Sequence, residues 1–129
     1  MSVTIPLEIV EKKISNVGNL ETMYYLSVLR QERLDFEEMC HLIAERTTLS
    51  AYEVEFVLSE LQDIAIENLR IGRGIELGRL GCIEPSINVT AVGKKEDINL
   101  KTIKKARLIY KPSKSIKTAL KKLKFKIKQ

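Results

Sequence analysis

Two successive helix-start signals constrain the fold of this chain more than any other feature. In Asp35-Phe-Glu-Glu38, the aspartate can cap the free amides of a first helical turn, and the glutamate three residues later occupies the capping-box position. Ser50-Ala-Tyr-Glu53 repeats this signal, and apolar residues at helical spacing follow both starts. The first helix should end near Thr47 and the second at Gly72. We therefore predict two helices joined by a short link, which is a helical hairpin.

The second of these helices carries an unusually broad apolar stripe. Its main stripe consists of Val54, Val57, Leu58, Leu61, Ile64 and Ala65. Ile66 and Leu69 widen the stripe beyond the single face that one neighbour would cover. This breadth predicts that the helix contacts apolar partners on more than one side.

The residues on either side of the hairpin have β character. After Gly72, the glycine-punctuated stretches 74–78 and 81–85 suit a strand, a tight turn and another strand, and residues 103–110 predict a further strand. Before the hairpin, residues 1–19 are ambiguous, residues 16–19 read as a turn, and residues 23–29 predict a strand. These patterns predict an α+β fold.

Pro112-Ser113 opens a last predicted helix that has two different faces. One face is apolar, with Ile116, Ala119, Leu120 and Leu123, and the other is a lysine stripe, with Lys114, Lys117, Lys121 and Lys124. Beyond residue 123, apolar residues alternate with lysines in the manner of a strand.

Charge is distributed very unevenly along the chain. Residues 1–93 contain 8 Lys and Arg against 15 Asp and Glu, whereas residues 94–129 contain 14 against 2. A basic block on an otherwise acidic chain indicates a polyanionic partner. Nucleic acid is the commonest such partner, an anionic membrane surface is the second, and a solvated lysine face is the alternative without a partner.

The sequence offers little to support catalysis, a metal site or a cofactor. His41 is the only histidine, so no Ser/His/Asp arrangement can form, and we interpret it as a surface residue. Cys40 and Cys82 form neither a CxxC motif nor a disulfide framework, and we interpret both as buried thiols. The glycines between residues 72 and 81 match no phosphate-binding motif. We therefore expect no enzyme activity, no cofactor, no metal and no small-molecule substrate.

Nothing in the sequence predicts membrane insertion or export. No apolar run approaches the roughly 20 residues that span a bilayer. Glu8 and Glu11 interrupt the apolar residues at the N-terminus, which lacks a signal-peptide pattern. We therefore expect a cytoplasmic protein.

The order of these elements resembles the HU/IHF family of bacterial histone-like proteins. The Leu49-Ser50 start of the second helix is similar to the family's helix 2, and residues 74–84 look like its Gly-x-x-Val-x-Leu-x-Gly-Phe-Gly-x-Phe stretch. Tyr110-Lys-Pro-Ser-Lys-Ser-Ile-Lys117 looks like its Phe-x-Pro-Gly-Lys-x-Leu-Lys ending. The length and the added N-terminal strand resemble the longer HU-like proteins of Bacteroides-type bacteria.

The resemblance implies a single HU-like DNA-binding domain over residues 1–129. Residues 1–34 would be an N-terminal extension with a strand, and residues 35–123 would be the core. In that core, the N-terminal helical hairpin would pack on an antiparallel β-sheet with a β-arm and a C-terminal helix. It also implies an intertwined homodimer, double-stranded DNA as partner, and association with the nucleoid in chromosome organisation.

The chain departs from the family at three places. Arg79 and Leu80 replace the first Gly-Phe of its Gly-Phe-Gly, and Ser113 replaces the glycine of its C-terminal ending. The arm stretch, residues 87–105, contains neither the proline nor the arginine of the family's Arg-Asn-Pro tip. The family's sharp DNA bending by an inserted proline therefore does not carry over.

A lysine-rich surface predicts non-specific binding to the phosphate backbone, because lysine is a point charge whereas arginine can read guanine. The expected contacts lie on the arm, the last strand and the last helix, with one weaker candidate in the glycine-rich turn. They are Lys94, Lys95, Lys101, Lys104, Lys105, Arg107, Lys111, Lys114, Lys117, Lys121 and Arg79. The competing interpretation is an HU-fold protein-interaction or assembly module that has lost DNA binding.

Overall fold

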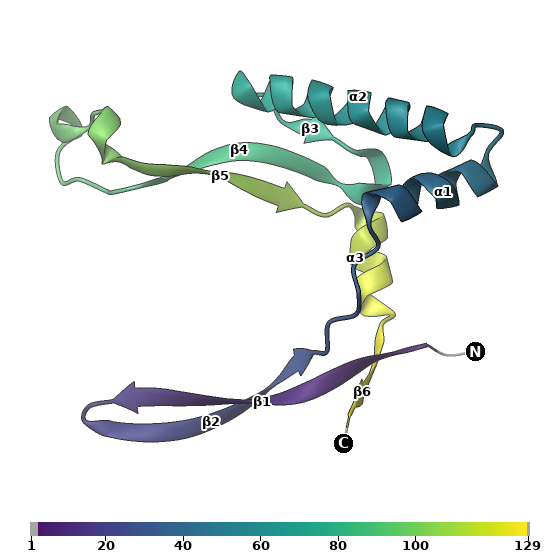
Figure 1. The fold of residues 1–129 in the computed structure, drawn as a ribbon. Coiled ribbons are helices and arrows are strands. Elements are labelled where there is room, and N and C mark those ends of the chain that lie inside the picture. The colour runs from purple at the N-terminus through teal and green to yellow at the C-terminus, as the bar shows by residue number, and fades with distance from the viewer. Residues whose placement is uncertain (1–2, 129) are drawn as a thin grey trace. The chain divides into compact units, whose positions relative to one another are not determined.

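A computed structural model describes residues 3–128, and its backbone divides into two compact units. The first unit comprises the chain up to Arg33 together with the segment from Ala119 onward, and the second comprises Leu34–Thr118. The chain is a mixed α+β protein (Figure 1). No helix among residues 3–128 is long and apolar enough to cross a membrane.

The first unit is a three-stranded sheet with strand order β2-β1-β6. Strands β1 (Thr4–Asn16) and β2 (Asn19–Val28) form a long antiparallel hairpin. Val17 and Gly18 join the strands with positive φ angles of 42° and 82°. This backbone shape matches the twist of paired strands, so a two-residue loop suffices. The predicted turn at residues 16–19 is confirmed, and β2 starts earlier than the predicted strand at residues 23–29.

The third strand of this sheet comes from the far end of the chain. β6 (Lys124–Ile127) pairs in parallel with the start of β1, from Thr4 opposite Lys124 to Leu7 opposite Ile127. The alternation of lysine and apolar residues after residue 123 therefore marks a strand. Lys124 belongs to this strand, so its predicted place on the helical lysine stripe was wrong.

The second unit begins with the predicted helical hairpin. Helix α1 (Phe36–Arg46) is capped by Asp35, whose carboxylate accepts a hydrogen bond from the Glu38 amide at 2.8 Å. Helix α2 (Ala51–Arg70) starts with a complete capping box, in which Ser50 and Glu53 each accept a hydrogen bond from the other's backbone amide. Gly72 follows α2 with φ 85°, as a helix stop requires. Both predicted helices are confirmed.

A second three-stranded sheet, all antiparallel in the order β3-β4-β5, follows the hairpin. β3 (Ile75–Glu76) is short and lies against α2, while β4 (Cys82–Val89) and β5 (Ile103–Lys111) run side by side towards a tip (Figure 1). The predicted tight turn between β3 and β4 is a 3₁₀ turn at Gly78–Leu80. Helix α3 (Lys114–Lys121) then begins close to the predicted Pro112-Ser113 start.

Very few side chains are buried within one copy of the chain. Cys40 and Val54, at 3% and 2% exposure, are the only buried hydrophobic residues among those that the structure describes. Val57, Leu61 and Ile64 on α2 are all exposed. Cys82 is only half-buried, so the prediction of two buried thiols was wrong for that residue. A single copy therefore leaves half of the main apolar stripe of α2 exposed.

Candidate nucleic-acid interface

Alternation along β5 places three basic residues on one face of the second sheet. Lys105, Arg107 and Lys111 are separated by two or four positions, and successive strand residues point to opposite faces. Their β4 neighbours on that face include Ser86 and Asn88, which lie opposite Arg107 and Lys105. All three basic residues are exposed. The result is a surface on two paired strands that is basic and polar around Lys105 and Arg107, with Ile109 between Arg107 and Lys111.

Lys104 stands outside this alternation because the ladder contains a bulge. Asn88 lies opposite Lys105 and Val89 lies opposite Ile103, so Lys104 has no directly opposite residue. A bulge adds one residue to one strand and increases its local twist. The sequence predicted Lys104 as an arm residue, but the register shift that changes its direction was visible only in the structure.

One of the predicted residues is already engaged within the chain. The Lys111 ammonium lies 3.0 Å from a Glu84 carboxylate oxygen. The hydrogen bond and the charge of Glu84 raise the pKa of Lys111 above its usual 10.5. This pairing offsets the positive charge of Lys111, so a phosphate would have to compete with Glu84 for it.

The end of the arm is built from turns and not from paired strands. Pairing of β4 and β5 stops at Val89 and Ile103, and the intervening residues form two 3₁₀ turns, Lys95–Asp97 and Leu100–Thr102. The Asn99 side chain caps the second turn by accepting from the Lys101 amide at 2.8 Å. Lys94, Lys95 and Lys101 therefore sit on a turn-built tip, where polar residues near residue 99 favour local turns over a ladder.

This tip also carries exposed apolar side chains that the sequence analysis did not single out. Ile98 and Leu100 are 65% and 84% exposed among the tip lysines. The sequence does show two aliphatic residues within a polar, lysine-rich stretch. Their exposure could not be predicted, because it depends on the turns that carry them. Apolar side chains at such positions are the kind that architectural proteins insert between base steps.

The start of α3 is tied to the turn that carries Arg79. The Ser113 hydroxyl donates to the Arg79 carbonyl and accepts from the Ile116 amide at 3.2 Å, so it caps the helix and holds the turn. Lys114 and Lys117 are exposed in the first turns of this helix. Lys121 lies at its last residue, within the segment that belongs to the first unit. Only backbone atoms of Arg79 take part in this contact.

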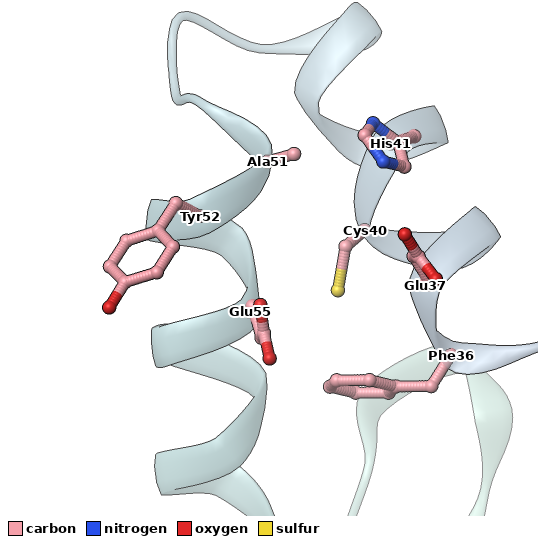
Figure 2. Close-up of a pocket in the computed structure, with 7 residues that line it drawn as sticks. All are labelled: Phe36, Glu37, Cys40, His41, Ala51, Tyr52 and Glu55. Carbon is pink, nitrogen blue, oxygen red and sulfur yellow. The ribbon is translucent and has the colours of Figure 1, made fainter.

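A pocket lies between the two helices of the hairpin. It has a volume of about 390 Å³ and is lined by α1 and α2 (Figure 2): Phe36, Glu37, Cys40, His41, Ala51, Tyr52 and Glu55. The Cys40 sulfur points from α1 towards α2. Burial, followed by the charges of Glu55 and Glu37, raises the pKa of the Cys40 thiol. Since the thiolate is the reactive form, these surroundings disfavour a nucleophilic cysteine.

The described residues also lack a cluster that could hold a metal ion. No group of three or more His, Cys, Asp or Glu side chains within residues 3–128 is arranged as a set of metal ligands. His41 has acidic and thiol neighbours in the pocket, but they do not amount to such a set.

Comparison with known proteins connects this architecture to a defined family. A family model described as "HU domain fused to wHTH, Ig, or Glycine-rich motif" (HU-HIG) matches residues 1–127. A search of curated proteins found no match. Among solved structures, the chain is similar to a protein from Bacteroides vulgatus that is provisionally classed as a bacterial DNA-binding protein, with a TM-score of 0.59 and 13% identity. The match covers 97% of this chain and 49% of that one, so this chain spans about half the length of its structural relative.

Proposed function

Because this chain belongs to the HU-HIG family, we propose that it binds double-stranded DNA without sequence preference, as a non-enzymatic architectural protein of the nucleoid. In this proposal residues 1–129 act as one HU-like domain, and lysines contact the phosphate backbone. The observation that carries it is the exposed basic surface formed by the β5 face, the bulged Lys104 and the lysines of the arm tip.

The composition of this surface favours phosphate contacts over base reading. It contains lysines almost exclusively, and Arg107 is the one arginine after residue 93. Lysines that neutralise phosphates release condensed counterions, which makes binding strongly dependent on salt. If about six lysines contact phosphates, the slope of log affinity against log salt concentration should be about −5.

The proposed phosphate contacts are not equivalent. The contributors are Lys94, Lys95, Lys101, Lys104, Lys105 and Arg107 on the arm and β5, together with Lys114, Lys117 and Lys121 on α3. Lys111 should contribute less, because Glu84 already neutralises it. Arg79 is the weakest candidate, because the 3₁₀ turn uses only its backbone.

A titration of duplex DNA at several salt concentrations tests this proposal. Replacing both Lys105 and Arg107 with Gln should weaken binding at every salt concentration and reduce the magnitude of the slope by about 2. The matched control replaces Lys12 and Lys13, which are exposed on β1 in the acidic part of the chain, and it should leave affinity unchanged. Absent binding at low salt, or binding that ignores salt, would refute DNA binding through phosphates.

Leu100 gives the arm tip a way to deform DNA that does not need a proline. Its side chain is exposed beside Lys101, which could anchor the adjacent phosphate. Leu100→Ala should reduce DNA bending, measured by energy transfer between dyes at the duplex ends, more than it reduces affinity. An unchanged bend in this variant would show that the tip does not insert Leu100.

We also propose that the functional species is a homodimer joined through the helical hairpins. Val57, Leu61 and Ile64 recur at helical spacing on α2 and are exposed in one copy. If the α2 stripes of two copies packed against each other, these side chains would be buried and would form a hydrophobic core shared by the two helical hairpins.

An assembly module that has lost DNA binding is the second candidate function. The observation in its favour is the amount of apolar surface exposed outside the basic region, notably on β1 and β2. In that case the unmodified chain would bind DNA only at background level, and the double variant Lys94→Glu/Lys95→Glu would bind no more weakly than the unmodified chain. Under the DNA-binding proposal the same pair of changes lowers affinity at least as much as Lys105 and Arg107 replacement does.

A further inference from the structure

The outer edge of β2 is a long strand edge that pairs with no other strand among residues 3–128. β2 is the end strand of its sheet, with β1 as its neighbour. All of its residues except Ser27 are exposed. Six of its ten residues are large and apolar or aromatic, and their exposed fractions range from 49% to 74%. They are Leu20, Met23, Tyr24, Tyr25, Leu26 and Val28.

The register of the hairpin identifies which backbone groups of β2 point outward. Asn16 and Asn19 flank the two-residue loop and form the first pair of the ladder. At the other end, the Leu29 amide donates to the Pro6 carbonyl at 3.0 Å. In an antiparallel ladder hydrogen-bonded pairs alternate, so odd-numbered residues of β2 bond to β1. The backbone groups of residues 20, 22, 24, 26 and 28 therefore point away from the sheet.

The other strand edges that the structure describes carry charged residues that discourage pairing. β6 has lysines at 124 and 126, with Lys128 just beyond its end. The part of β1 beyond β6 contains two glutamates and two lysines, and the outer strand β5 contains four basic residues. β2 contains neither lysine nor proline, and Glu21 is its one charge. Charged residues and prolines are the usual protection of an edge strand, so β2 is unprotected.

We propose that the edge of β2 pairs with β2 of a second copy of this chain, antiparallel and centred on Tyr24. In this register Tyr24 lies opposite Tyr24 of the second copy, Thr22 opposite Leu26, and Leu20 opposite Val28. Each outward-pointing residue from 20 to 28 gains a hydrogen-bonding partner. The pairing joins two three-stranded sheets into one continuous sheet.

Self-complementarity of the strand favours a second copy as the occupant. The register places Glu21 opposite Ser27, so the one charge of β2 does not face its own copy. Like charges directly opposite on paired strands destabilise a sheet, and aromatic pairs such as Tyr24 with its own copy stabilise it. A two-fold axis perpendicular to the sheet also keeps the even-numbered side chains of both copies on the same face.

Near β6, the face that this pairing extends is apolar within one copy, whereas Glu11 and Lys13 lie on the same face closer to the hairpin loop. Val28 and Leu26 lie opposite Leu7 and Ile9 on β1, and Ile5 and Leu7 lie opposite Phe125 and Ile127 on β6. Pairing through β2 places Leu20, Tyr24, Leu26 and Val28 of both copies on one face, whereas a one-residue slip would move one copy's side chains to the other face.

This contact is independent of DNA binding and distinct from the helical-hairpin contact proposed above. A chain with two separate two-fold contacts to other copies can link dimers into larger assemblies. The edge of β2 would then connect DNA-bound dimers to one another.

Amide hydrogen exchange read residue by residue tests the pairing without any substitution. In an unpaired hairpin, the amides of the odd-numbered residues 21–27 are protected and those of the even-numbered residues 20–28 exchange freely. We expect the even-numbered amides to become protected as protein concentration rises. Free exchange of these amides at every concentration, or protection that does not change on dilution, would overturn the proposal.

A charge substitution at the two-fold axis provides the second test. Tyr24→Lys places two lysines directly opposite each other, so the assembly measured by sedimentation should lose the association step that depends on β2. Mixing Tyr24→Lys with Tyr24→Glu should restore it, which also shows that both variants fold.

The matched control is Glu11→Lys. Glu11 lies opposite Tyr24 on β1, on the same face but one strand away from the edge. This variant should assemble like the original chain. Unchanged assembly in Tyr24→Lys, or equal loss in Glu11→Lys, would overturn edge pairing, and the second result would indicate that the sheet face is the contact.

Discussion

At the scale of single residues, Gly81 occupies a position that no other residue can fill. Its φ is 109°, and a Cβ placed there would lie 2.1 Å from the Lys111 carbonyl oxygen. This close approach brings the 3₁₀ turn against the junction of β5 and α3, where Ser113 bonds to Arg79. The glycine pattern predicted a turn in this region, but only the fold shows which backbone approaches it.

Gly81→Ala should therefore destabilise the chain considerably. The backbone conformation alone costs about 1–3 kcal/mol for a residue with a Cβ, and the clash with backbone adds to that cost. Thermal unfolding should show a clear drop in the midpoint. Gly93→Ala is the matched control, because Gly93 has no positive φ and a Cβ added there would meet nothing within 4 Å. A Gly81→Ala midpoint equal to that of the control would contradict this role.

Cys40 and Cys82 should differ in reactivity. Burial raises the pKa of the Cys40 thiol above its usual 9.0, while Cys82 is half-buried. At pH 8, iodoacetamide should therefore modify Cys82 first, as read by mass spectrometry of digested protein. Equal rates for the two cysteines in the folded chain would contradict the burial of Cys40.

The raised pKa of the Cys40 thiol also makes the stability of the fold depend on pH in the alkaline range. The unfolded chain loses the Cys40 proton near pH 9.0, whereas the folded chain retains it to higher pH. Stability from this group is therefore fully present below pH 9.0 and declines as pH rises through the folded pKa. Denaturant midpoints measured from pH 8 upward should fall in the original chain and fall less in Cys40→Ala.

At the scale of elements, the start of α2 depends on two side chains that act together. The Glu53 amide donates to Ser50 at 3.1 Å, and the Ser50 amide donates to Glu53 at 3.3 Å. Ser50→Ala should cost about 1 kcal/mol of stability, as loss of a helix cap usually does. Glu53→Ala should add less in the Ser50→Ala background than alone, because each change removes part of one reciprocal arrangement. Strictly additive costs in denaturant unfolding would show that the two bonds are independent.

The elements that the sequence predicted well are those whose signals are local. Capping residues lie within four positions of the amides they satisfy, and the turn at residues 16–19 is decided by its own two loop residues. β6 could not be predicted with equal ease, because its partner is the beginning of the chain, with Thr4 opposite Lys124. The pairing exists only after the chain has folded back on itself.

In the candidate interface, too, some features could be predicted from the sequence and others depend on how the strands pair. Its residue types followed from composition, and Arg107 lies on the predicted last strand, whereas Lys105, which was predicted for the arm, lies on β5. The bulge at Lys104 and the Glu84 partner of Lys111 depend on the register between β4 and β5. Register follows from cross-strand packing, which one strand's sequence does not contain.

At the scale of the whole molecule, the scarcity of buried side chains within one copy is the dominant property. α2 packs Val54 inward but leaves Val57, Leu61 and Ile64 open. Covering an aliphatic side chain of this size stabilises a protein by about 1.5–3 kcal/mol relative to leaving it exposed. Because these side chains are about half exposed in one copy, a homodimer through α2 would recover part of this contribution from both copies, and folding would then depend on association.

The denaturation midpoint should consequently rise with protein concentration, because a partner copy stabilises only the folded state. Ile64→Glu should abolish that dependence and lower the mass seen by sedimentation, since it places a charge within the shared stripe. Asp63→Lys is the matched control, because it changes the charge of an exposed α2 residue on the face opposite that stripe. If Ile64→Glu associated like the control, α2 would not be the contact. The edge of β2, tested separately through Tyr24, would then have to account for any association that persists.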